Sequence, residues 1–96
     1  MNIPFLGKVV VVRTYAAGVH VGKVVDKDSD EVMLENARRI WGWRGANTLH
    51  ELALHGIEKG SRVSEPVPSI FVKGVIELIP ATPEAIAKIE SAGWSK

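Results

Sequence analysis

Runs of β-branched residues predict that the first half of the chain forms strands. Valine dominates residues 7–14, and a second apolar stretch covers residues 19–25 after a break at 15–18. A third segment, residues 31–41, follows a polar turn at 28–30, where short side chains can bond their own backbone. Connections this short join antiparallel neighbours, so we expect a three-stranded antiparallel meander.

Between residues 47 and 56 the apolar positions take on the spacing of a short helix. Asn47 or Thr48 can cap its start, and Gly56 can end it in a left-handed conformation. A helix of about two turns is marginal in isolation, so this one is expected to depend on packing against the sheet.

The last third of the chain predicts a further strand region and a second helix. Two prolines make residues 65–68 extended and unsuited to a central strand. Residues 69–79 are rich in apolar β-formers, with a break expected at Gly74. The triplet 82–84 is a strong helix start, because a capping threonine precedes a proline and an acid, and the helix should end near Gly93.

These patterns together predict a single domain, residues 1–96, of the α+β class. We expect a small antiparallel sheet or partly open barrel of four or five strands, with two short helices. The hydrophobic fraction of 46% is that of an ordinary globular domain, and no linker or repeat divides the chain. A domain of this size has a thin core, and association into oligomers is one common remedy.

Composition excludes several classes of function. The chain has no cysteine, which rules out disulfides, thiolate metal sites and a cysteine nucleophile. No apolar run approaches the ~18 residues of a membrane span, and the N-terminal residues lack the layout of a signal peptide. We therefore expect no membrane partner and a cytosolic location.

The net charge of +1 conceals an uneven distribution of charge. Residues 1–25 and 36–50 each carry three cationic side chains and no acid, whereas residues 26–31 carry four acids and one lysine. The acidic run is typical of a solvated turn. If the two acid-free stretches adjoin, they form a cationic patch on a nearly neutral protein, which favours a small anionic ligand over bulk nucleic acid.

Little in the sequence points to catalysis. His50 and His55 are five positions apart and would diverge by about 140° on a helix, so they cannot chelate one metal. His20 stands alone in a strand, and no phosphate-binding glycine loop or hydrolase motif occurs. We expect no enzyme activity, no metal and no cofactor.

The chemistry of the sequence is concentrated in residues 36–46, which we call the Arg–Trp block. On a strand, Arg39, Trp41 and Trp43 would project to one face and Arg38 to the other. Arginine can donate two parallel hydrogen bonds to phosphate oxygens. Stacking of an indole on a nucleobase contributes ~1–3 kcal/mol to the free energy of binding. Small residues around the block allow close approach, and the helix that follows could offer free N–H groups to an anion. Which of the two adjacent arginines faces a ligand depends on the strand register.

The same residues admit a second interpretation. Tryptophans in a small domain commonly fill the core or a subunit interface, and an arginine beside one often only stacks on it. Arg13 and Tyr15 form a second arginine–aromatic pair on the first strand, which favours a ligand site but also fits the rim of a sheet.

Beyond these patterns, the chain resembles a family of small phage-encoded proteins of formerly unknown function. The resemblance covers nearly the full length, and its most specific part is the Arg–Trp block. The matching positions are residues 12–22, 37–46 and 75–80, with Leu49, Leu52, Ala53 and Gly56. The family is in turn similar to the anti-CBASS sponges, which sequester the cyclic nucleotide signals of bacterial defence as homo-oligomers.

The resemblance implies a phage anti-defence protein that binds a cyclic dinucleotide, or a related nucleotide signal, without cleaving it. Such a protein would act in the cytoplasm of the host bacterium as a homo-oligomer, a dimer or a tetramer. Arginines would contact phosphates, aromatic side chains would stack on bases, and a histidine would bond a base or ribose. The residues assigned to these contacts are Arg13, Arg39, Arg44, Tyr15, Trp41, Trp43 and His20. The alternative is a phage structural or assembly protein, or a host-protein-binding module, that uses the Arg–Trp block as a protein interface.

Overall fold

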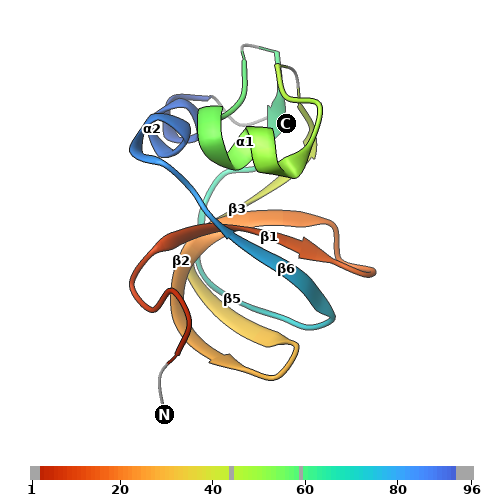
Figure 1. Ribbon diagram of the computed structural model, residues 1–96, viewed down its shortest axis with the longest axis vertical. Helices are drawn as coiled ribbons and strands as arrows, with labels where there is room; N and C mark the ends of the chain where they lie inside the picture. Colours follow the sequence, from red (N-terminus) through yellow and green to blue (C-terminus); the bar gives the residue numbers. More distant parts are fainter. Residues whose placement is uncertain (1–2, 44, 59, 93–96) are drawn as a thin grey trace.

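A computed structural model describes residues 3–43, 45–58 and 60–92, and its six strands and two helices make an α+β domain. Figure 1 shows both helices gathered at one end of the molecule, with the strands curving away from them. The strands are β1 (Val9–Thr14), β2 (Val19–Asp28), β3 (Glu31–Gly42), β4 (Arg62–Val63), β5 (Val67–Val72) and β6 (Val75–Pro80). The helices are α1 (Leu49–His55) and α2 (Pro83–Ser91). The predicted fold class is confirmed.

The strands form one open antiparallel sheet in the order β4-β3-β2-β1-β6. The expected meander is its centre, since β2 pairs with both β1 and β3. β3 is long enough to serve two further partners, with β5 on its first half and the two-residue strand β4 near its end. The sheet therefore has more strands than the four or five expected, because β4 is too short to leave a pattern and the region 69–79 divides at Gly74 into two strands.

The sheet has a separate apolar core on each face. On one face Val11, Val21 and Ile40 pack against Leu52 of α1 and Ile89 of α2. On the other face the buried residues that the structure describes all come from strands, and they are Val10, Val12, Val24, Val32, Leu34, Ala37 and Val72. Strict alternation along β1 produces this division, because successive side chains point to opposite faces of a strand.

The two helices begin where the sequence predicts. Thr48 caps α1 by accepting a hydrogen bond from the backbone N–H of Glu51, and Gly56 ends it with a φ of 81°. Thr82 caps α2 in the same way through Ala85, and the helix ends at Ser91, slightly before the expected Gly93.

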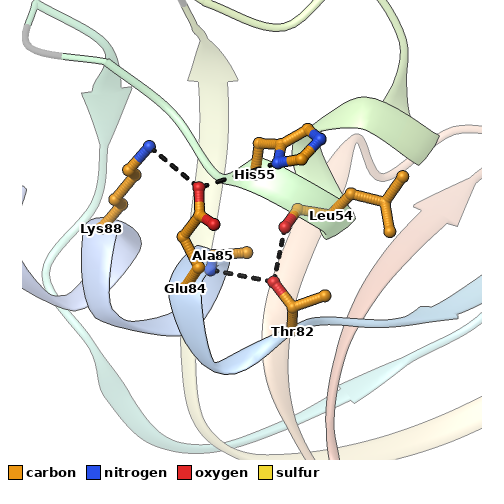
Figure 2. Close-up of polar contacts among 6 residues, drawn as sticks. All are labelled: Leu54, His55, Thr82, Glu84, Ala85 and Lys88. Atoms are coloured by element: carbon orange, nitrogen blue, oxygen red, sulfur yellow. Dashed lines mark hydrogen bonds and ion pairs between the residues drawn. The ribbon is translucent and has the colours of Figure 1, made fainter.

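A polar junction fixes the helices to each other (Figure 2). The Thr82 hydroxyl donates to the backbone O of Leu54 at the end of α1 (2.6 Å) while it accepts from the N–H of Ala85 (3.1 Å). Glu84 lies between Lys88 (3.3 Å) and His55 (3.7 Å). Neither helix of the described residues is long and apolar enough to cross a membrane.

Candidate functional site

Two adjoining hollows lie at the end of the sheet where β1 turns into β2. The first, the Trp41 hollow, has a volume of about 530 Å³ and is lined by Gly18, Val19, Arg39, Ile40, Trp41 and Trp43. The second, the Glu77 hollow, has a volume of about 510 Å³ and is lined by Arg13, Thr14, Gly18, Val19, Trp43, Asn47, Thr48, Leu49, His50 and Glu77. Gly18, Val19 and Trp43 belong to both, so the hollows share a wall. The fold thus brings the first strand and the Arg–Trp block together.

The strand register gives the two adjacent arginines different roles. Nη1 of Arg38 donates to the backbone O of Ala92 (3.2 Å) and of Ile89 (3.5 Å), so this guanidinium binds the carbonyl end of α2. A cation there satisfies orphan carbonyls and complements the helix dipole. Arg39 is exposed and lines the Trp41 hollow, so it is the arginine available to a ligand.

Arg39 is held in place by the β1–β2 turn. Its Nη2 donates to the backbone O of Ala17 (2.7 Å), and the guanidinium lies against Gly18. A Cβ added at Gly18 would come within 3.1 Å of that nitrogen, and the φ of 85° also favours glycine. A guanidinium carries several N–H donors, so one bond to Ala17 leaves others for a phosphate.

The two tryptophans of the block differ in burial. Trp41 is 48% exposed, and its ring is open to solvent. Trp43 is half-buried, packs against the helix-side core and donates its Nε1–H to the backbone O of Ala46 (3.2 Å). Trp43 therefore packs as a core side chain, whereas Trp41 is exposed and accessible to a ligand or to another subunit.

Arg13 is not an isolated cation. It faces Glu77 across the β1–β6 pairing, with 3.3 Å between Nη1 and Oε1. The other carboxylate oxygen of Glu77 is 3.9 Å from Nε2 of His50 on α1. Neither Glu77 nor His50 is among the residues expected to bind a ligand. The available signal was that Glu77 is a single acid inside the apolar strand β6.

His20 does not reach either hollow. Its side chain is buried (5% exposed), and its Nε2–H donates to the backbone O of Ala17 (3.0 Å), the same oxygen that Arg39 bonds. Burial lowers the pKa of His20 below 6.5, the hydrogen bond to Ala17 opposes this shift, and the charge of Arg39 adds to it. The structure gives His20 the role of supporting the turn beneath Arg39, in place of the expected ligand contact.

We expect the free energy of unfolding to fall as the pH is lowered through 6.5, the usual pKa of a histidine. Because the folded-state pKa of His20 is lowered, the unfolded chain takes up a proton here before the folded protein does. The loss should begin as the pH passes down through 6.5, where the unfolded histidine titrates, and end once the folded histidine is charged. Urea unfolding at a series of pH values measures it.

Two substitutions test whether His20 causes that pH dependence. His20→Gln should flatten it, because the amide can still donate to Ala17 but does not titrate in this range. Tyr15→Ala, at an exposed side chain beside the same β1–β2 turn, is the control and should keep the wild-type slope. An unchanged slope in His20→Gln would show that another group is responsible.

Three further expectations concern Tyr15, the start of α1 and Arg44. Tyr15 is 88% exposed and lies beside Gly74 at the rim of the sheet, and it does not line either hollow. Two N–H groups around the start of α1 have partners within the chain, since that of Glu51 donates to Thr48 (3.2 Å) and that of Asn47 to the Glu51 carboxylate (3.3 Å). Arg44 lies outside the described residues.

A third hollow, of about 310 Å³, lies between α2 and strands β2 and β3. Its charged side chains are Lys23 and Arg38 against Glu35 and Glu90, so the charges of its walls balance. Arg38 is also engaged by the end of α2. This hollow therefore offers an anion less than the Trp41 hollow, where Arg39 lines the wall and no acid is among the lining residues described.

The fold and the two hollows define a small α+β domain with arginine and tryptophan around a recess at one end of its sheet. The chain belongs to the family described as "Domain of unknown function (DUF6948)", whose model matches residues 7–89. The matched range includes every residue that lines the two hollows. No curated protein and no solved structure gives a match.

Proposed function

We propose that this protein binds and sequesters a cyclic dinucleotide signal without cleaving it, as a phage anti-defence protein in the cytoplasm of the host bacterium. The observation that carries the proposal is the meeting of Arg39, Trp41 and Trp43 around one hollow, with Arg13 in the hollow that adjoins it. A cyclic dinucleotide presents two phosphates and two bases in one compact ring, so two adjoining recesses that combine guanidinium and indole groups are complementary to it.

The proposal gives each wall of the hollows a role. Arg39, held by Ala17, presents a fixed donor to a phosphate, and Trp41 presents an open ring to a base. Trp43 is anchored through Ala46, so a base stacked on it meets a surface that is already ordered. An ordered wall reduces the entropy lost on binding, which favours affinity. Sequestration requires affinity alone, and no general acid or base is assigned.

The proposal includes a homo-oligomer, a dimer or tetramer, in which a second subunit covers the exposed side of the ring. Trp41 supports this part, because a large indole about half exposed beside a recess can contact both a ligand and a neighbouring chain. Light scattering with and without nucleotide measures the assembly state.

Thermal unfolding in the presence of cyclic di- and trinucleotides tests the function. A ligand at a hundred times its dissociation constant stabilises the folded state by about 2.7 kcal/mol, which for a domain this small raises Tm by roughly 10 °C or more. Pyrophosphate at matched ionic strength is the control for general anion binding. The nucleotide should also be recovered intact when the complex is denatured. No shift for any cyclic nucleotide, together with a stable complex with another protein, would favour the interface alternative.

A further inference from the structure

The Glu77 hollow contains a carboxylate where a site for phosphates alone would have none. Among the described residues that line it, Glu77 is the one acid, on the middle of strand β6. Its Oε1 lies 3.3 Å from Arg13 and its Oε2 lies 3.9 Å from His50, so the bond to Arg13 holds the carboxylate at the wall of the recess. An ionised carboxylate can only accept hydrogen bonds, and it repels phosphate. A ligand group beside it must therefore be a donor.

The rest of the hollow fits the face of a base. Val19, Leu49 and Trp43 supply its apolar surface, and the indole of Trp43 is fixed by its bond to Ala46. A flat aromatic ligand group packed on this surface would present its edge to the polar wall formed by Glu77 and His50. Phosphates, by contrast, are accommodated better beside Arg39 in the adjoining Trp41 hollow.

Guanine is the base whose edge matches a carboxylate. Its Watson–Crick edge carries two adjacent donors, N1–H and the N2 amino group, which can bond the two oxygens of one carboxylate. Adenine presents one amino donor beside an acceptor nitrogen, and that acceptor would face Glu77 without a partner, which is costly when desolvated.

We infer that Glu77 is a specificity-determining residue that selects a guanine base in the Glu77 hollow, so that the sequestered ring contains guanine. The inference rests on the proposed function and narrows it to one class of signal. Arg13 acts as a positioning residue in this arrangement, because it holds the carboxylate from the neighbouring strand.

Calorimetric titration with cyclic di-GMP and cyclic di-AMP tests the inference. The wild-type protein should bind cyclic di-GMP at least about tenfold more tightly, within the range expected of one bidentate base contact. Glu77→Gln should lower the affinity for cyclic di-GMP and raise the affinity for cyclic di-AMP, because a glutamine amide can pair with adenine and the negative charge is removed. Glu84→Gln, which removes an exposed ion-paired carboxylate of α2, is the matched control and should bind both as the wild type does.

Each outcome has one meaning. Opposite changes for the two rings in Glu77→Gln support the inference, since a merely structural role would lower both affinities together. Equal affinities in the wild type, or equal losses in the variant, overturn the guanine assignment while the proposed function stands. Failure of both rings to bind the wild type, with binding of a cyclic nucleotide that contains no guanine, also overturns it. Failure of every cyclic nucleotide overturns the proposed function itself. The wild-type comparison decides the matter even where the variant folds poorly.

Discussion

Replacing Arg39 with alanine should lower the affinity for the bound cyclic dinucleotide by about tenfold to a hundredfold. A hydrogen bond to a charged group contributes about 1.5–3 kcal/mol, and Arg39 is the exposed cation of the Trp41 hollow. Trp41→Ala should weaken the free energy of nucleotide binding by a similar amount, about 1–3 kcal/mol, through the loss of base stacking. The double variant should lose binding to the limit of calorimetric detection.

Two controls accompany these variants. Lys73→Ala removes an equal charge at an exposed lysine whose partner is Glu31, and it should leave affinity unchanged. Tyr15→Ala removes an exposed aromatic side chain that lines neither hollow, and it should also bind normally. If Trp41→Ala instead dissociates an oligomer while nucleotide affinity stays the same, Trp41 belongs to a protein interface and its assignment to base stacking is wrong.

Leu34→Ala should be the most destabilising of the substitutions considered. Leu34 is fully buried in the core on the sheet face opposite the helices, where it meets Ala37 and Gly22 closely packed beneath it. Truncating a buried leucine to alanine costs about 2–5 kcal/mol, from lost apolar burial and from the cavity left behind. Small domains have a total stability of about 5–15 kcal/mol, so the loss is a large fraction.

Urea unfolding followed by circular dichroism measures this effect. Leu54→Ala is the matched control, because Leu54 is 53% exposed on α1, and it should change the free energy of unfolding by no more than about 0.5 kcal/mol. Equal effects of the two substitutions would show that the face without helices is not a closely packed core.

The local features of the fold were predictable because short-range chemistry specifies them. Valine-rich runs predicted β1 and β2, and the cap at Thr82 with a following proline located the start of α2. Helix caps depend on bonds between residues three positions apart, so they can be found without tertiary information. The two-residue strand β4 could not be found in this way, since its pairing with β3 depends on the fold around it.

The candidate site was predictable in part. The alternation of β3 correctly separated Arg39 from Arg38, but only the packing of α2 shows that Arg38 binds the carbonyls at its end. His20 lies in a strand as predicted, yet its side chain is buried and bonds the β1–β2 turn. A period of two assigns a residue to a face of the sheet, and it does not say what covers that face.

By itself, the sequence determined the fold class, the helix starts and the concentration of guanidinium and indole groups in one segment, because propensity, capping and alternation act over a few residues. The tertiary structure alone decided which of those groups share a recess. Arg13 and Glu77 are 64 positions apart and meet through the β1–β6 pairing, and the same assembly leaves Tyr15 outside the hollows. Strand pairing between distant segments is set by the packing of the whole domain, and it is this pairing that places the carboxylate of Glu77 beside Arg13.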